Sequence, residues 1–417
     1  MIQERKWSSV ISTKIDKNLA IIQIMWLSLL MRITIVNQSI WLVVELVGVI
    51  LCLTYTFTNL KYFRKKALLL VMLFTAAYLL SSLLNRSYNG RLTTYTGFIF
   101  ACKVFIYFAV PWIAIGKKGS KRVVQASWNC LMFYWIPSII TVFAQGRNVI
   151  DNANNVYFIG NKFNVAYLNV VMLCLLLFLN NERKENCSRS FVLKINSKKI
   201  GVFLFYAMIV FIDYYMKAYT GLFMILFILI LAILSRYLQF RIAKKWSGFL
   251  NFIGKPLIVT ISVVASGLVA IILEAIMNIP TIGAYLASIG KTGNILSRTL
   301  IYKNLAEIIE RKPLIGYGYG SAIVSRYFGP NAQNGLAQVM IYTGILGTFL
   351  MLLITFYCCK AGGQSKGSQS AAFLYAIYAF ILSATVEITY GGTFFILLAF
   401  YCACGWEKRL SRGDIYE

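Results

Sequence analysis

One long polar passage, residues 297–334, carries the residue types that could do chemistry on an anionic ligand. They are Arg298 at its start, Gly316 and Gly318 in its middle, and Gln333 and Asn334 at its end. A guanidinium binds phosphate oxygens in pairs and stays charged at any working pH. Glycine lets backbone N–H groups turn toward an anion, and amide side chains both donate and accept hydrogen bonds. The passage therefore indicates a site for a phosphate-bearing ligand.

Each of these features also has a structural interpretation. Arg298 and Lys303 would anchor a helix at a membrane surface if their side chains reach the phosphates of ordinary lipid. Gly316 and Gly318 would form a turn between a helix and a membrane span, or let the chain pack closely on that span. Both interpretations stay open on the sequence alone.

The chain contains no histidine, which removes the commonest general base and metal ligand. Proton transfer would have to use a carboxylate, and the candidates are Glu387, Glu307 and Asp213. No clustered carboxylate pair suggests a divalent cation, so we expect neither a metal nor another cofactor. The nine cysteines do not show the spacing of a zinc site.

These polar residues must be positioned by membrane spans, because 59% of the 417 residues are hydrophobic. This composition excludes a soluble protein and is typical of a polytopic membrane protein. A helix needs about 20 apolar residues to cross a bilayer. The runs near that length are 19–36, 40–58, 67–84, 93–115, 123–144, 163–179, 200–212, 220–238, 256–277, 336–359, 371–386 and 393–405. We therefore expect an all-α bundle of about twelve transmembrane helices.

Basic residues alternate between the two sides of these spans. The net charge is +27, and most of the 41 lysines and arginines lie in every second connection and near the two termini. The positive-inside rule places those connections in the cytoplasm. Both termini are then cytoplasmic, and residues 279–334 form one large extracytoplasmic loop. The charge follows membrane topology and needs no nucleic-acid partner.

The outer loop has a helical pattern of its own. Apolar residues recur at helical spacing over residues 300–312 and predict an amphipathic helix. Ser297 is suited to cap its start, and Pro313 ends it. The chain then reads as a single membrane domain, residues 1–417. Its parts are spans one to nine in 1–278, an extracytoplasmic catalytic loop in 279–334, spans ten to twelve in 335–405, and a cytoplasmic tail in 406–417.

Two charged residues fall well inside predicted spans. Lys103 lies near the middle of the fourth span, and Glu45 lies in the second. Charges in hydrocarbon are costly, so they usually line a polar cavity or pair with each other. A role in a substrate path remains open, as does a structural pair of Glu45 with Lys103 or with Arg32.

Three motifs, spread over most of the chain, resemble those of the O-antigen ligase and polymerase superfamily. They are Gly160-Asn161-Lys162-Phe163-Asn164 after the fifth span, Arg298 followed by Lys312-Pro313-Leu314-Ile315-Gly316-Tyr317-Gly318 in the outer loop, and Gln333-Asn334 followed by Thr343-Gly344-Ile345-Leu346-Gly347 at the tenth span. The superfamily includes Wzy-like polysaccharide polymerases and WaaL-like ligases. Its members resemble this chain in layout as well, as GT-C-like bundles with cytoplasmic ends and a large outer loop before the tenth span.

Two positions depart from the family pattern. Gln333 stands where the family has a histidine, so an imidazole cannot transfer a proton there. The Ser-Arg common at the start of the eighth span is also missing; Lys217 is the nearest cation. Both departures weaken a ligase assignment more than a polymerase assignment.

The resemblance implies a metal-independent glycosyltransferase that uses glycans carried on undecaprenyl pyrophosphate. The implied catalytic residues are Arg298, Gln333, Asn334 and Glu387. The implied pyrophosphate-binding residues are Arg298, Lys217, Lys103, Gly316 and Gly318. The implied glycan-positioning residues are Asn161, Asn164, Glu307, Tyr317 and Tyr319.

The function expected from the resemblance is that of a polysaccharide polymerase at the outer face of the bacterial cytoplasmic membrane. It would join lipid-linked repeat units in capsule, exopolysaccharide or O-antigen assembly. Its partners would be the lipid-linked oligosaccharide, the membrane, and chain-length regulator and flippase proteins. The alternatives are a ligase that passes finished glycan to another acceptor, and a flippase or transporter of lipid-linked oligosaccharide. A transporter commonly has two matching halves with broken spans, and the sequence has no such symmetry.

Overall fold

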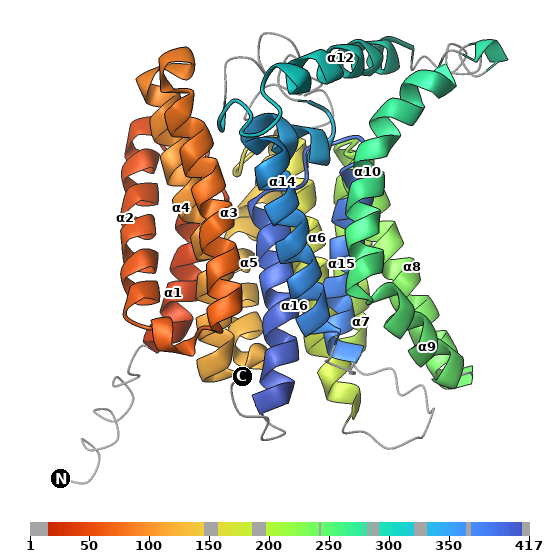
Figure 1. The fold of residues 1–417 in the computed structure, drawn as a ribbon. Coiled ribbons are helices and arrows are strands. Elements are labelled where there is room, and N and C mark those ends of the chain that lie inside the picture. The colour runs from red at the N-terminus through yellow and green to blue at the C-terminus, as the bar shows by residue number, and fades with distance from the viewer. Residues whose placement is uncertain are drawn as a thin grey trace.

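The computed structural model of the protein is a bundle of helices (Figure 1). It describes residues 16–145, 157–185, 197–241, 243–277, 279–281, 284, 292–320, 332–363 and 368–410. The helices named here are α1 (Lys17–Met25), α2 (Gln38–Phe57), α3 (Lys65–Leu84), α4 (Arg86–Lys118), α5 (Ser120–Gln145), α6 (Lys162–Glu185), α7 (Ser197–Tyr215), α8 (Tyr219–Arg241), α9 (Ala243–Ile253), α10 (Pro256–Met277), α12 (Thr292–Arg311), α14 (Gly335–Gly362), α15 (Ser368–Ser383) and α16 (Gly392–Leu410). A π-helix, η2 (Trp26–Leu30), follows α1, and a 3₁₀-helix, η3 (Leu60–Tyr62), precedes α3. Within the described ranges there is no β-strand, so the expected all-α class is confirmed.

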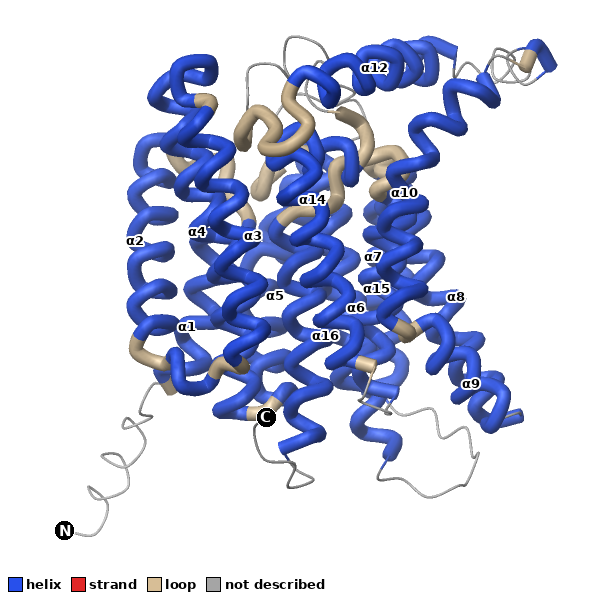
Figure 2. The backbone as a smooth tube through the Cα atoms, viewed as in Figure 1, coloured by secondary structure: helices blue, strands red, loops and turns tan. Residues whose placement is uncertain are grey.

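Apolar helices account for the membrane character of the chain. The first apolar run coincides with α1 and η2 together over most of its length, and each of the other eleven coincides with one helix. Among the described residues, six helices are long and apolar enough to cross a bilayer, and six apolar helices are shorter. Most helices run side by side, whereas α12 lies across one end of the bundle (Figure 2). The chain is therefore an all-α membrane protein.

The two ends of the bundle differ in the elements that they carry. We call the end covered by α12 the α12 end (Figure 1). The opposite end holds the start of α1, the end of α16, η3, and the turn between α4 and α5. We call it the basic end after six residues of η3, α3 and α4: Lys61, Arg64, Lys65, Lys66, Lys117 and Lys118.

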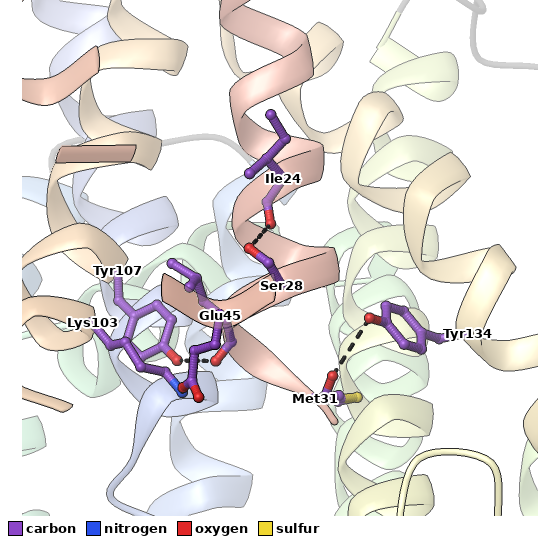
Figure 3. Close-up of polar contacts among 8 residues, drawn as sticks. Ile24, Ser28, Met31, Glu45, Lys103, Tyr107 and Tyr134 are labelled. Atoms are coloured by element: carbon purple, nitrogen blue, oxygen red, sulfur yellow. Dashed lines mark hydrogen bonds and ion pairs between the residues drawn. The ribbon is translucent and has the colours of Figure 1, made fainter. Parts of the chain in front are cut away.

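The first helix ends inside the bundle. The apolar pattern predicts a span over 19–36, but the helix stops with η2. Two tyrosines bind carbonyl groups that are released there: the Tyr107 hydroxyl donates to Leu29 O at 2.7 Å, and the Tyr134 hydroxyl to Met31 O at 3.5 Å (Figure 3). Backbone groups in hydrocarbon need such partners. Hydroxyls of α4 and α5 therefore replace the hydrogen bonds that a longer helix would have made.

A short helix, α9, stands where the sequence suggested only a basic connection. It covers Ala243–Ile253, directly before α10. Phe249 and Phe252 of this helix are 40% and 51% exposed. A search for membrane spans does not find this helix, because its 11 residues are too short to cross a bilayer and include lysines. Its length and exposed rings are typical of a helix that lies at a membrane surface.

Small residues set the contact between α14 and α16. A Cβ atom at Gly405 would lie 1.9 Å from the carbonyl oxygen of Ala361. A Cβ atom at Gly362 would lie 2.4 Å from Cδ1 of Tyr401. The two backbones thus approach too closely for a side chain at either position. Helices in membranes associate through close packing of this kind, so these glycines hold the last helix against the bundle.

We expect Gly405→Ala to destabilise the protein by about 1–3 kcal/mol, since the added methyl group would collide with backbone that cannot move aside. The matched control is Gly201→Ala in α7, where nothing lies within 4 Å of the new Cβ. Gly201→Ala should be neutral or stabilising by up to about 1 kcal/mol. Thermal unfolding in detergent micelles measures both changes. Equal melting temperatures for the two variants would contradict this view of the α14–α16 contact.

Candidate functional site

The predicted amphipathic helix of the outer loop is present as α12. Ile301, Leu305 and Ile308 of α12 pack against Tyr317 and Ile341. The prediction of Ser297 as its cap was wrong, since α12 already begins at Thr292. Thr, Asn and Ser all suit helix starts, and all three occur between 292 and 297, so Ser297 was not the only candidate.

The chain after α12 fills a break in α14. Gly344 interrupts α14 with φ 65° and ψ −168°. The segment Pro313–Tyr319, which we call the docked segment, lies along this break. Its backbone hydrogen bonds are Ile345 N to Pro313 O at 2.7 Å, Leu346 N to Leu314 O at 3.2 Å, Tyr317 N to Ile341 O at 2.8 Å and Gly318 N to Tyr342 O at 3.0 Å. The docked segment thus supplies partners for backbone groups that the broken helix leaves unpaired.

The other side of the docked segment is held by α3 and α4. Asn85 Nδ2 donates to Gly316 O at 3.0 Å, and Asn89 Nδ2 donates to Tyr317 O at 2.6 Å. Lys312 Nζ donates to Asn85 Oδ1. Sequence reasoning did not single out Asn85 and Asn89 as site residues. The sequence feature that could have found them is their spacing: they lie four residues apart, just after an apolar run. If the helix continues there, both side chains lie on one face of it.

Gly316 and Gly318 serve this docking. Both have left-handed backbone, with φ 65° and 90°. A Cβ atom at Gly316 would lie 2.5 Å from Ile341 O. The N–H groups of residues 316–319 all donate within the protein, the first to Lys312 O at 3.2 Å and the last to Ser82 Oγ at 3.3 Å. In this arrangement none of these four N–H groups is available to an anion. Gly316 and Gly318 therefore allow close packing of the chain against α14, as one of the two interpretations of the sequence had it.

The two tyrosines of the docked segment point into the protein. Tyr317 is buried, and its hydroxyl donates to Ile308 O at 2.8 Å. The ring of Tyr319 stacks on Phe100 with centroids 3.9 Å apart and lies 5.1 Å from the ring of Tyr342. Both rings therefore fasten the docked segment to α12, α4 and α14.

Asn334 joins three parts of the bundle at the start of α14. Its Oδ1 accepts from Ala337 N at 3.0 Å and caps α14. Its Nδ2 donates to Ser266 O at 2.9 Å in α10 and to Thr385 O at 3.3 Å in the connection after α15. Asn334 is completely buried. Its amide therefore positions the start of α14.

Gln333 and Glu387 lie on either side of this junction. Gln333 has left-handed backbone with φ 51°, and its carbonyl accepts from the Tyr302 hydroxyl at 2.9 Å. Glu387 lies two residues after Thr385, is only 8% exposed, and donates its N–H to Ser383 O at 2.9 Å. The structure thus brings α12, Gln333, Asn334 and the connection that carries Glu387 to one place at the α12 end.

Arg298 belongs to α12, but its side chain lies outside the described residues. Helix register still places position 298. It precedes Tyr302 by four residues and Leu305 by seven, so the three share a face of the helix. Tyr302 is 5% exposed, and Leu305 packs against the Tyr317 cluster. Position 298 is therefore on the face of α12 that is turned toward the bundle.

The remaining candidates are distributed around the bundle. Lys103 Nζ lies 2.5 Å from Glu45 Oε1, and each side chain is 17% exposed (Figure 3). Of the two pairings that the sequence left open, Glu45 with Lys103 is the one found. Lys217, exposed and with φ 54°, lies in the turn between α7 and α8. Close to that turn, Asp213 is fully buried and accepts a hydrogen bond from Asn169 at 2.6 Å.

Three candidates for glycan positioning have local structural contacts. Asn161 Oδ1 accepts from the N–H groups of Phe163 and Asn164, both at 3.1 Å, and so caps α6. Asn164 Nδ2 donates to Ile159 O at 3.0 Å. Glu307 forms an exposed pair with Arg311 one turn along α12, at 2.5 Å. These contacts account for the two asparagines as parts of the turn before α6.

No group of three or more metal-binding side chains occurs among the residues described. No protein-family model matches the chain, and no curated protein matches it either. The site must therefore be judged on its own residues and geometry.

Removing one member of the Glu45–Lys103 pair should be more harmful than removing both. Glu45→Gln leaves an ammonium group inside the bundle without its counter-ion, so we expect a loss of about 3–5 kcal/mol. The double variant Glu45→Gln, Lys103→Met removes both charges and should recover most of that loss. Unfolding in detergent measures both free energies. A single variant as stable as the parent protein would show that the pair does not stabilise the bundle.

Proposed function

We propose that the protein is a polysaccharide polymerase that joins undecaprenyl-pyrophosphate-linked oligosaccharide repeat units. The observation that carries the proposal is the convergence of two separate motifs at the α12 end. Arg298 lies on the inward face of α12, the docked segment follows this helix, and Gln333 with Asn334 opens α14 beside the same helix. Residues that resemble the motifs of one enzyme superfamily are thus assembled in one place.

The topology of the proposal follows from charge. The basic end faces the bacterial cytoplasm, with both termini, and the α12 end faces outward. About twelve helices cross the cytoplasmic membrane, although several of them are short. The polymerase then receives lipid-linked repeat units that a flippase has delivered to the outer leaflet, and a chain-length regulator is a natural partner.

The proposed reaction forms one glycosidic bond and breaks one bond to phosphate. A hydroxyl of the acceptor sugar attacks the anomeric carbon of the donor, and the electron pair of the carbon–oxygen bond leaves with undecaprenyl pyrophosphate. This leaving group is a weak base, so it needs cations more than a proton donor. Arg298 is the chief cation, and exposed Lys217 supports it. A single well-placed donor of this kind contributes about 3–4 kcal/mol to transition-state stabilisation.

The hydroxyl proton needs an acceptor, and Glu387 is our candidate. It is nearly buried beside the junction made by Asn334, where a carboxylate would be shielded from water. Gln333 offers an amide for hydrogen bonds with sugar hydroxyls but no group that takes up a proton. Lys103 is left out of the proposed site because Glu45 already neutralises it, and Glu307 because it pairs with Arg311.

Arg298→Ala tests the proposed function in the living cell. We expect long-chain polymer to fall by a factor of about 10²–10³, as for the loss of one transition-state donor. Single lipid-linked repeat units should accumulate on the outer side of the membrane. Extraction and size separation of polymer and lipid-linked glycan measure both. The matched control is Arg311→Ala, which removes a guanidinium that is 58% exposed from the same helix and should leave the polymer unchanged.

Other outcomes of this experiment separate the alternatives. Repeat units that accumulate on the cytoplasmic side would indicate a flippase. Polymer that is formed but not transferred to its final acceptor would indicate a ligase. Unchanged polymer in the Arg298→Ala strain, with protein level equal to the parent, would exclude Arg298 from the reaction.

The proposed reaction also predicts independence from divalent cations. Polymerisation by the purified protein in vesicles should keep its rate in excess EDTA, because fixed cations and not a metal stabilise the pyrophosphate. A rate that collapses with EDTA and returns with Mg²⁺ or Mn²⁺ would contradict the proposed mechanism.

A further inference from the structure

A pocket lies at the basic end, on the opposite side of the bundle from the proposed active site. It is lined by residues of η3, α4 and α16 and by the residue just before α3, among them Tyr62, Arg64, Trp112, Gly116, Trp406 and Glu407. Its cavity volume is about 30 Å³, and it opens to the outside of the protein. None of these residues takes part in the proposed polymerase reaction, so that reaction gives the pocket no role.

Arg64 lies over an aromatic ring in this pocket. Its guanidinium carbon lies 5.2 Å from the centre of the Trp406 ring, and that ring lies 4.9 Å from Trp112. Arg64 forms no ion pair with a carboxylate in the described part of the chain. A guanidinium over an aromatic ring is attracted to the ring face and still has N–H groups that can donate to an anion. The guanidinium of Arg64, which has no carboxylate partner among the described residues, can therefore bind an anion.

Trp406 lines the same pocket and carries a buried indole N–H. Its side chain is 8% exposed, and its indole N–H has no hydrogen-bond partner among the described residues. A buried N–H normally finds a partner, because leaving it unpaired is costly. The pocket is therefore lined by a residue whose polar group the described residues leave unpaired, directly beside the cation of Arg64.

The acidic residues nearby are already engaged. Glu407 Oε2 accepts from Ser120 N at 3.0 Å at the start of α5. Asp16 Oδ2 lies 2.7 Å from Lys118 Nζ, and the hydrogen bond from Lys118 holds the pKa of Asp16 below its usual range. Glu407 lines the same pocket as Arg64, but neither carboxylate forms an ion pair with Arg64.

Further positive charge surrounds the pocket mouth. The ammonium groups of Lys117 and Lys61 lie 4.7 and 5.5 Å from the centre of the Tyr62 ring. With Arg64 they place three cations around one aromatic opening. The field at this opening is therefore positive, and it favours an anion with several oxygens.

We propose that this pocket binds the phosphate head group of an acidic phospholipid from the leaflet at the basic end. Arg64 donates to the phosphate oxygens from its position over the Trp406 ring, while Lys61 and Lys117 add charge. The chain just before Tyr62 offers exposed apolar side chains for the lipid tails, since Phe57 and Leu60 are 59% and 39% exposed. Inorganic phosphate shares the head-group chemistry but lacks the tails that these residues contact.

Native mass spectrometry of the purified full-length protein, titrated with phosphatidylglycerol, tests the proposal. We expect Arg64→Ala to weaken lipid binding about tenfold or more, through the loss of charge-assisted hydrogen bonds. The side chain of Arg64 does not cap α3, so the variant should fold. The matched control is Lys65→Ala, which removes the same charge one residue along from an exposed position outside the pocket. This control should bind the lipid as the parent does.

A second variant blocks the pocket without touching a charge. Nothing lies within 4 Å of a Cβ atom built at Gly116, so Gly116→Leu should fill the space while α4 stays intact. We expect the same loss of phosphatidylglycerol binding, with an unchanged melting temperature. Gly116→Leu retains Arg64. It therefore still tests whether the lipid binds in the pocket if Arg64→Ala fails to fold.

Three results would overturn the proposal. Equal losses in Arg64→Ala and Lys65→Ala would mean that diffuse surface charge, and not the pocket, attracts the lipid. Full lipid binding by Gly116→Leu would place the lipid elsewhere. Displacement of phosphatidylglycerol by millimolar inorganic phosphate would make the pocket a site for a free anion.

Discussion

The break in α14 at Gly344 is the constraint on which the α12 end depends. A helix interrupted in a membrane protein leaves backbone groups without partners, and such groups must be satisfied within the protein. Here the docked segment Pro313–Tyr319 satisfies them from one side. Because this segment follows α12 directly, the same hydrogen bonds also determine where α12 can lie. The position of Arg298 in α12 therefore depends on the hydrogen bonds that satisfy the interrupted helix α14.

Asparagine side chains complete this construction. Asn85 and Asn89 bind carbonyl groups of the docked segment, and Asn334 ties the start of α14 to α10 and to the connection after α15. Amides suit this task because each can donate and accept at once without carrying charge into a low-dielectric region. These neutral amides position the docked segment and the start of α14 without adding a charge of their own.

The sequence predicted the helices well and their contacts poorly. Apolar runs located the helices because a span needs a minimum length of apolar chain, and Pro313 correctly marked the end of α12. The partners of the docked segment were beyond reach, because Asn85 and Gly316 meet only through the folded bundle. For the same reason the sequence could not decide whether Gly316 and Gly318 face an anion or pack against α14.

Two other differences have local causes. The first helix ends early because hydroxyl groups from α4 and α5 bind its released carbonyl groups, and hydropathy contains no sign of this. Ser297 lies inside α12, because the helix already begins at Thr292, in a stretch that also carries Asn294. The Glu45–Lys103 pair was one of the alternatives that the sequence allowed, since a charge inside a span needs a partner.

The central claim is that the α12 end faces outward, where the lipid-linked donor lies. The most direct measurement uses a chain whose own cysteines are replaced, with one cysteine introduced at exposed Glu310 of α12 or at exposed Lys66 of α3. A membrane-impermeant maleimide should label position 310 in intact cells and position 66 only after the membrane is opened. Labelling of position 66 from outside, with position 310 protected, would contradict the account.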